Sequence, residues 1–329
     1  MNPKPINRRE FLTVAGMAAL GGAAACSGQA SPTYQPVAKA TPSGPRKRLL
    51  RLAHLTDFHI EPDSPGVEGM ARALRHAQSQ ADRPDFILNT GDCIMDSLGK
   101  SKNSTTEQWD TFNRVLKAEL KLPIYHAIGN HDVWGWGWNS PEIKADPLYG
   151  KAMALQQLGL KQRYYSFDRG GWHFIVLDST HKPNEASKHP YIGKLDDEQF
   201  DWLVKDVEAT PASTPVCIAS HIPIVSACEY FDGENEESGN WVIPAAWVHI
   251  DARRLRQFFL GHPNLRLCLS GHTHQHERVD YLNVTYFTNG AVCGSWWQGA
   301  YLDFPPAYVL VDLYDDGSAE SQFVSYDSA

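Results

Sequence analysis

The feature of this sequence that most constrains the fold is a series of short apolar runs that each end abruptly at polar residues. Runs bounded in this way are typical of strands buried in sheets that are covered on both faces. They lie at residues 49–55, 86–88, 124–128, 174–177, 216–219 and 265–269. The sequence therefore predicts a set of buried strands, each of which delivers a polar side chain at its carboxyl end.

Segments with helical periodicity separate these runs, at residues 67–80, 107–121, 196–208 and 251–260. The tail from Val279 onward has the pattern of strands, and Asp315-Asp316-Gly317 is typical of the turn in a terminal hairpin. This order predicts an α/β fold in which two mixed β-sheets pack face to face and are flanked by helices. The polar strand ends should gather at one rim, where ligands bind in open α/β sheets.

The polar residues at this rim form a donor set for metal ions. They are carboxylates, imidazoles and one amide: Asp57, His59, Asp92, Asn130, His131, His221, His272 and His274. Oxygen and nitrogen donors of this kind suit divalent or trivalent ions such as Mn, Fe or Zn. One ion takes about four to six ligands. The surplus of donors therefore predicts two ions that share a bridging carboxylate.

The same residues occur in motifs whose order resembles that of the calcineurin-like metallophosphoesterases over residues 49–290. The motifs are Asp57-x-His59, Gly91-Asp92, Gly129-Asn130-His131-Asp132, the isolated His221, and Gly271-His272-Thr273-His274. The resemblance implies that Asp57, His59 and His274 hold one ion. It implies that Asn130, His221 and His272 hold the second ion and that Asp92 bridges the two.

The resemblance also implies an αββα sandwich that hydrolyses a small phosphomonoester or phosphodiester. A hydroxide that bridges two cations would attack the phosphorus, and His131 would protonate the departing oxygen or steady the phosphoryl group. Two positions depart from the relatives. Met95 stands where purple iron enzymes have a tyrosine, which argues against a redox-coloured iron site. Asp96 stands one residue after the acid that orients the catalytic histidine in protein phosphatases.

Two alternatives stay open at the level of sequence. The chain could be a non-catalytic metal-binding scaffold of the same fold, although the complete donor set and His131 favour an enzyme. It could also be a nuclease. Its formal net charge of −8 argues against nucleic acid as a partner, because an acidic protein repels a polyanion. The sequence indicates no oligomeric state.

The N-terminal segment is typical of an export leader. Arg8-Arg9 precedes a mild apolar run from Thr13 to Ala25, which predicts a twin-arginine signal over residues 1–26. Residues 27–48 are rich in Pro, Ser, Thr and Ala and predict a disordered linker before a catalytic domain at 49–329. We therefore expect a periplasmic or cell-envelope protein. Cys26 follows three alanines as in a lipobox, so simple cleavage and a lipid tether to the membrane remain alternatives.

Several other residues favour structural roles. His54, His126 and His173 lie in apolar strands, where hydrogen-bonded core histidines are more common than ligands. The cysteines after Cys26 predict small buried side chains. Cys228 and Cys293, both in loop-like sequence, are the pair to test for a disulfide.

Two loops are expected near the substrate. Trp134-Gly-Trp136-Gly-Trp138 alternates indole with glycine, and we expect these indoles to wall the cleft. A cluster of acids at positions 229, 232, 234, 236 and 237 predicts a solvated insertion over the cleft. Acids and indoles together would suit a cationic head group. His276 is expected to have a structural role rather than to contact phosphate.

Overall fold

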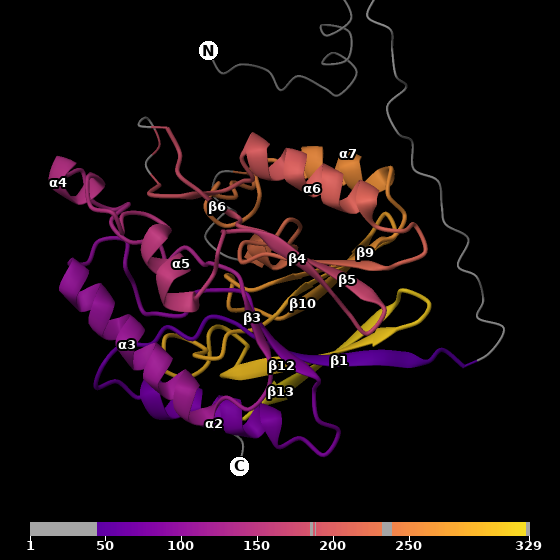
Figure 1. Cartoon of the computed structure of the whole chain (residues 1–329), viewed down its shortest axis with the longest axis horizontal. Coiled ribbons are helices and arrows are strands. Elements are labelled where there is room, and N and C mark those ends of the chain that lie inside the picture. The colour runs from indigo at the N-terminus through magenta and orange to yellow at the C-terminus, as the bar shows by residue number, and fades with distance from the viewer. Residues whose placement is uncertain (1–44, 185–186, 188, 232–238, 327–329) are drawn as a thin grey trace, which may run out of the picture. The chain divides into compact units, whose positions relative to one another are not determined.

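The computed structural model describes residues 45–184, 187, 189–231 and 239–326 of the chain (Figure 1). The predicted leader, most of the predicted linker and the acids at positions 232, 234, 236 and 237 lie outside the described residues. The strands are β1 (Arg48–Leu55), β2 (Phe86–Asn89), β3 (Ile124–His126), β4 (Tyr165–Arg169), β5 (Trp172–Val176), β6 (Thr180–His181), β7 (Ile192–Gly193), β8 (Val216–Ala219), β9 (Leu265–Ser270), β10 (Glu277–Tyr281), β11 (Val284–Thr288), β12 (Ala307–Tyr314) and β13 (Ala319–Ser325).

The helices are α2 (Gly66–Gln78), α3 (Lys102–Glu119), α4 (Pro141–Lys144), α5 (Ala152–Leu158), α6 (Asp197–Ala209) and α7 (Ala252–Leu260), with a 3₁₀ turn η1 (Cys228–Phe231). The predicted apolar runs and helical segments are confirmed, with small shifts at their ends. The largest shift is in α3, which begins at Lys102 because the Ser101 side chain accepts a hydrogen bond from the Ser104 backbone N–H. Among the described residues, none of the helices has the length and apolar character needed to cross a bilayer.

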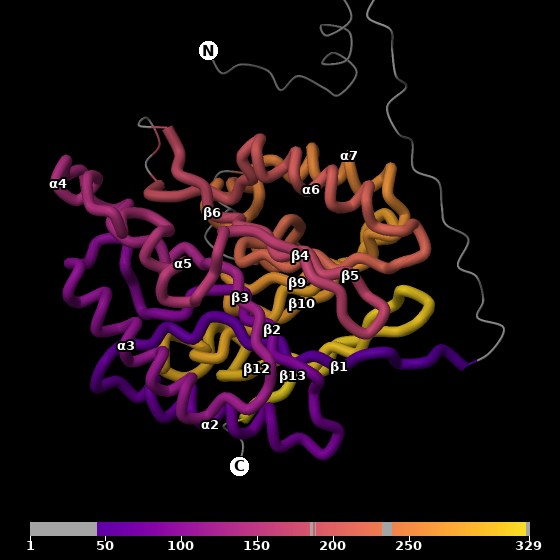
Figure 2. The backbone as a smooth tube through the Cα atoms, in the orientation of Figure 1, coloured from indigo at the N-terminus to yellow at the C-terminus, as the bar shows by residue number. Residues whose placement is uncertain are grey.

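Two large mixed sheets form the centre of the fold. The first has the order β13-β12-β1-β2-β3, in which β1, β2 and β3 run parallel and β12 is antiparallel to both of its neighbours. The second has the order β10-β11-β9-β8-β5-β4, with a parallel centre and an antiparallel strand at each edge. Figure 2 shows β1 beside β12, so the last strands of the chain complete the sheet that the first strand begins.

Alternation along the strands divides the apolar side chains among three layers. Leu52 of β1 and Phe174 of β5 share the core between the two sheets. Leu55, on the other face of β1, shares a core with Met70 of α2. Ile175, on the other face of β5, shares a third core with apolar residues of α6 and α7. Helices α2 and α3 therefore cover the first sheet and α6 and α7 cover the second, which confirms the predicted αββα sandwich (Figure 1).

Candidate metal centre

The predicted donors lie on loops that follow parallel strands of both sheets. The first sheet contributes Asp57 and His59 after β1, Asp92 after β2, and Asn130 and His131 after β3. The second sheet contributes His221 after β8, and His272 and His274 after β9. The strand order places these carboxyl ends at the same rim, so residues far apart in the sequence meet there.

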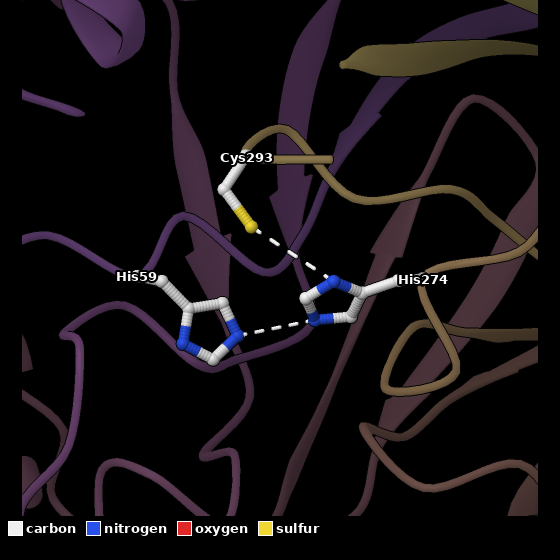
Figure 3. Close-up of side chains that lie close together, drawn as sticks. All are labelled: His59, His274 and Cys293. Carbon is white, nitrogen blue, oxygen red and sulfur yellow. Dashed lines mark hydrogen bonds between the residues drawn. The ribbon is translucent and has the colours of Figure 1, made fainter. Parts of the chain in front are cut away.

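Asp57, His59 and His274 form one group of donors, together with Asp92. His59 Nε2 lies 3.2 Å from His274 Nε2 and 3.6 Å from Asp92 Oδ2. His274 Nε2 lies 3.5 Å from Asp57 Oδ1. Figure 3 shows the imidazoles of His59 and His274 turned toward each other.

Asn130, His221 and His272 form a second group on the other side of Asp92. His221 Nε2 lies 2.9 Å from Asn130 Oδ1, 3.2 Å from His272 Nδ1 and 3.2 Å from Asp92 Oδ2. Asp92 Oδ2 is therefore close to a nitrogen of each group. This is the position that a bridging carboxylate would occupy.

Backbone carbonyls fix the tautomers of the four histidines. Because a carbonyl can only accept, the ring nitrogen that faces it must carry the hydrogen. These contacts are His59 Nδ1 to Met95 O (3.4 Å), His221 Nδ1 to Thr90 O (3.1 Å), His272 Nε2 to Ala246 O (2.9 Å) and His274 Nδ1 to Gly294 O (2.6 Å). In each neutral imidazole, the nitrogen that faces the site therefore carries a lone pair. Metal-binding histidines are oriented in this way.

The lone pairs meet in two facing pairs. His59 Nε2 faces His274 Nε2, and His221 Nε2 faces His272 Nδ1, each at 3.2 Å. Two unprotonated nitrogens at this distance repel each other unless a proton or a metal cation lies between them. The donor geometry of these residues therefore fits a metal ion in each group.

The charge states also suit metal binding. Burial lowers the pKa of His59 to about 3 and, with His221 beside it, that of His272 to about 3, so both rings are neutral at pH 7. Burial alone would raise the pKa of Asp57 and Asp92, but neighbouring histidines hold both below their usual range. Burial opposes a charge on His221, but Asp92 outweighs it and raises the pKa of His221 to about 9. The carboxylates of this site therefore stabilise a positive charge, here the proton on His221.

The backbone at the donors is in a conformation that side chains disfavour. Positive φ angles occur at Asp57 (56°), His59 (47°), Asp92 (52°), His272 (72°) and His274 (58°). Such angles are uncommon outside glycine, and they cluster at functional sites, where the surrounding structure enforces them. Gly129 permits the close approach of two of these loops, because a Cβ there would lie 2.1 Å from Asp92 Oδ1.

His131 stands beside the donor groups. Its ring centroid lies 4.8 Å from that of His59, and its backbone N–H donates to Asp92 Oδ1 at 2.8 Å. Asp96 Oδ1 lies 3.4 Å from His131 Nδ1, which makes Asp96 the acid that faces this ring. Burial works against protonation, but Asp92 and Asp96 raise the pKa of His131 above its ordinary value. A protonated imidazole can serve as a general acid.

A cleft of about 200 Å³ opens beside these residues. Among its lining residues are His131, Tyr191, Glu229, Trp247, Trp296 and Tyr301. Sequence reasoning did not place Tyr191, Trp247, Trp296 or Tyr301 there, because they lie on irregular loops that have no periodic pattern. Glu229 belongs to the acidic cluster that was expected over the cleft.

The prediction that Trp134, Trp136 and Trp138 wall the cleft is wrong, because none of the three is among its lining residues. Trp134 is buried, and its indole N–H donates to Lys100 O at 3.1 Å. The two glycines suit the backbone of the loop instead, because Gly135 has a φ of 85° and a Cβ on Gly137 would lie 2.8 Å from Leu98 O. Their N–H groups donate to the carbonyls of residues 97 and 98. The loop is thereby bound to the chain after β2.

The histidines that were assigned to the core are hydrogen-bonded there, as predicted. His54 contacts Thr90, His126 contacts Asn89, and His173 contacts Asp168 and Asp206. His276 is not among the residues that line the cleft; its ring lies 5.2 Å from that of Phe323.

The cysteines of the described residues are free and buried. The pair singled out for a disulfide has separate neighbours. Cys228 Sγ lies 3.3 Å from Glu277 Oε1, whereas Cys293 Sγ lies 3.9 Å from His274 Nδ1. Figure 3 shows the Cys293 thiol directed at one nitrogen of the His274 ring and His59 at the other nitrogen. His274 therefore turns a different nitrogen to each of these neighbours.

The sequence and the structure were compared with known proteins, and the comparison identifies a family, sequence relatives and a solved structure with a similar fold. The family model of the calcineurin-like phosphoesterases matches residues 50–276. A 3′,5′-cyclic-nucleotide phosphodiesterase of Nostoc sp. is 25% identical over 288 residues, which cover 83% of this chain and 91% of the relative. A 3′,5′-cyclic adenosine monophosphate phosphodiesterase of Haemophilus influenzae is 22% identical and covers 84% and 90%. A dimetal phosphatase from Danio rerio has a similar fold, with a TM-score of 0.57, 14% identity and coverage of 85% and 100%.

Proposed function

The chain belongs to the calcineurin-like phosphoesterase family of metal-dependent hydrolases that act on phosphoester bonds, and we propose on that premise that it hydrolyses a small phosphodiester at a two-metal centre. The observation that carries the proposal is the position of Asp92. Its Oδ2 lies 3.6 Å from His59 Nε2 and 3.2 Å from His221 Nε2, between two groups of donors. A carboxylate in that position can bridge two ions.

In this proposal Asp57, His59 and His274 hold one ion, and Asn130, His221 and His272 hold the other. When bound, such a pair of ions supplies a hydroxide at neutral pH and offsets the negative charge that develops on the phosphoryl oxygens. His131 donates a proton to the departing alkoxide, and Asp96 orients its ring.

A small diester is preferred over nucleic acid because of the shape and charge of the cleft. Its volume is about 200 Å³, and its lining residues, all of them within the described chain, include no lysine or arginine that could hold a polyanionic backbone. The relatives from Nostoc and Haemophilus influenzae carry the names of cyclic-nucleotide phosphodiesterases, which supports a diester.

Metal analysis of the purified protein, together with turnover of bis-p-nitrophenyl phosphate and p-nitrophenyl phosphate with added Mn²⁺, tests this proposal. We expect two ions per chain and a larger kcat/KM for the diester. Asp92→Ala should lose both metal and turnover, whereas the control Asp110→Ala, on the exposed side of α3, should lose neither. Full turnover by Asp92→Ala, or a protein that binds no ion when supplied with one, would contradict the proposal.

Export by the twin-arginine route to the periplasm or cell envelope is a second part of the proposal. It is supported by Arg8-Arg9 and the apolar run from Thr13 to Ala25. Replacing both arginines by lysine should leave the precursor in the cytoplasm, which cell fractionation would measure. Equal export of the two forms would refute this route. The mass of the mature N-terminus would separate simple cleavage from lipidation at Cys26.

A further inference from the structure

A chain of buried hydrogen bonds leads from the second sheet to the proposed metal ligand Asp57. Asn289 Nδ2 lies 2.5 Å from His54 Nδ1, and His54 Nε2 lies 2.8 Å from Thr90 Oγ1. Thr90 Oγ1 lies 2.8 Å from Thr56 Oγ1, which in turn lies 2.7 Å from Asp57 Oδ2. All five side chains are completely buried. The chain begins after β11 of the second sheet and ends after β1 of the first sheet.

The carboxylate fixes the direction of every hydrogen bond in this chain. A metal-binding carboxylate is ionised and can only accept, so the Thr56 hydroxyl donates its single hydrogen to Asp57. Thr56 must then accept from the Thr90 hydroxyl, and Thr90 must accept from His54 Nε2. Burial lowers the pKa of His54 to about 3, so the neutral ring carries its hydrogen on Nε2. His54 Nδ1 therefore has a lone pair, which accepts from the Asn289 amide.

This arrangement divides the two oxygens of Asp57 between the protein and the first donor group. Oδ2 accepts from the Thr56 hydroxyl at 2.7 Å and from the His272 backbone N–H at 3.0 Å. Oδ1 lies 3.5 Å from His274 Nε2 and 3.9 Å from His59 Nε2. Rotation of the carboxylate out of this orientation would break the hydrogen bond from Thr56. The chain therefore keeps Oδ1 turned toward the ring nitrogens of the first group.

Thr90 also contacts the second donor group. Its backbone carbonyl accepts from His221 Nδ1 at 3.1 Å, whereas its hydroxyl belongs to the chain that ends at Asp57. A substitution that removes the hydroxyl and keeps the backbone therefore changes the support of Asp57 without removing that of His221.

We propose that Asn289, His54, Thr90 and Thr56 are positioning residues, which hold Asp57 in the orientation in which it binds the ion of the first donor group. This inference rests on the proposed two-metal centre. Hydrogen bonds to a ligating side chain orient it and strengthen its hold on the ion. Successive hydrogen bonds that point the same way also strengthen one another in a buried site. A network that served only folding would leave the affinity for the ion unchanged.

The tautomer of His54 tests the direction of the chain. Long-range ¹H–¹⁵N spectra of the Zn²⁺-loaded protein, with the signal assigned by its absence in His54→Gln, should show the hydrogen on Nε2 at pH 7. Asn289→Asp has nearly the same shape but its carboxylate offers only acceptors, so His54 should then carry a hydrogen on Nδ1. A wild-type ring with its only hydrogen on Nδ1 would overturn the proposal, because Thr90 would then donate to His54 and not to Thr56.

The affinity for Mn²⁺, measured by titration and EPR spectroscopy, tests the effect on the ion. Thr90→Val removes the hydroxyl, and we expect Kd for one of the two ions to rise about 10- to 100-fold. Thr90→Ser restores a hydroxyl and should return Kd toward the wild-type value. The matched control is Thr105→Val in α3, where a buried hydroxyl donates to Ser101 O at 3.0 Å. This control should lower the stability and leave both Kd values unchanged.

The outcomes separate the two proposals. A wild type that binds no Mn²⁺ and does not turn over bis-p-nitrophenyl phosphate overturns the two-metal centre, and the positioning role with it. Two bound ions with the same Kd values in the wild type and in Thr90→Val overturn the positioning role alone. A rise in Kd that Thr90→Ser does not reverse, or that Thr105→Val shares, has the same consequence, because it would follow from a general loss of stability.

Discussion

His131 contributes to the proposed reaction without being one of the proposed ligands. It lines the cleft, and its raised pKa keeps it protonated to a higher pH than an ordinary histidine. We expect His131→Ala to retain its metal and its KM for bis-p-nitrophenyl phosphate but to lose about 10²- to 10⁴-fold in kcat, the range of general acid catalysis. Metal analysis and steady-state kinetics measure both. A variant that also loses its metal would instead make His131 part of the ion-binding set.

Asp96 is one of the two positions at which this sequence departs from the calcineurin-like motifs that it resembles. It faces His131 Nδ1 at 3.4 Å, although it stands one position later than the orienting acid of protein phosphatases. Asp96→Asn keeps the shape and removes the charge, so we expect an approximately tenfold lower kcat, with an unchanged KM. The double variant with His131→Ala should be no slower than His131→Ala alone. Additive losses would show that Asp96 acts independently of His131.

His173 lies outside the donor groups, and its ion pairs lead to a prediction about stability rather than activity. Burial opposes its charge, but hydrogen bonds to Asp206 and Asp168 outweigh this and raise its pKa above the ordinary 6.5. A raised folded pKa means that the charged form stabilises the fold below pH 6.5 and that this contribution disappears as the pH rises through the folded value. The free energy of unfolding lost in His173→Gln should therefore be larger at pH 5.5 than at pH 9. Equal losses in urea titrations at both pH values would argue against it.

At the scale of elements, the backbone packs closely where strands pass into the donor loops. A Cβ on Gly271, directly after β9, would lie 2.2 Å from Thr56 Oγ1 and 2.3 Å from Asp57 Oδ2. Gly271→Ala should therefore displace Asp57, with loss of metal and a destabilisation of about 1–3 kcal/mol. Metal content and thermal unfolding measure these effects. Gly99→Ala is the control, because a Cβ there meets no atom within 4 Å, and equal behaviour of the two variants would contradict this account.

The sequence predicted the elements better than it predicted the walls of the cleft. Apolar runs such as 216–219 are visible because a buried strand needs continuous apolar residues, and the donors follow from the ends of those runs. Trp296 and Glu229 belong to irregular segments, whose place depends on tertiary contacts such as the Trp297 indole on the Phe58 carbonyl. The prediction that the Trp134–Trp138 loop walls the cleft was wrong for the same reason. Its glycines are explained by the positive φ of Gly135 and by the close approach of Gly137 to Leu98, which is remote in the sequence.

At the scale of the whole molecule, the proposed ions would join the two sheets. Asp57, His59, Asp92 and Asn130 follow strands of the first sheet, and His221, His272 and His274 follow strands of the second. Binding to the folded state alone should add about 2.7 kcal/mol at a free metal concentration of a hundred times Kd. EDTA should therefore lower the Tm of the wild type and leave that of Asp92→Ala unchanged. A wild-type Tm that does not respond to metal would show that the sheets hold together without it.

The left-handed backbone at Asp57, His59, Asp92, His272 and His274 has a consequence over evolutionary time. Each of these angles costs the native state roughly 1–2 kcal/mol compared with a relaxed residue, and glycine would relieve that cost. A descendant that bound no metal and no longer turned over its substrate would be relieved of this cost as it lost these five side chains. Loss of activity in such a lineage would therefore remove a cost to the stability of the metal-free fold. Recovery of the activity would have to restore that cost.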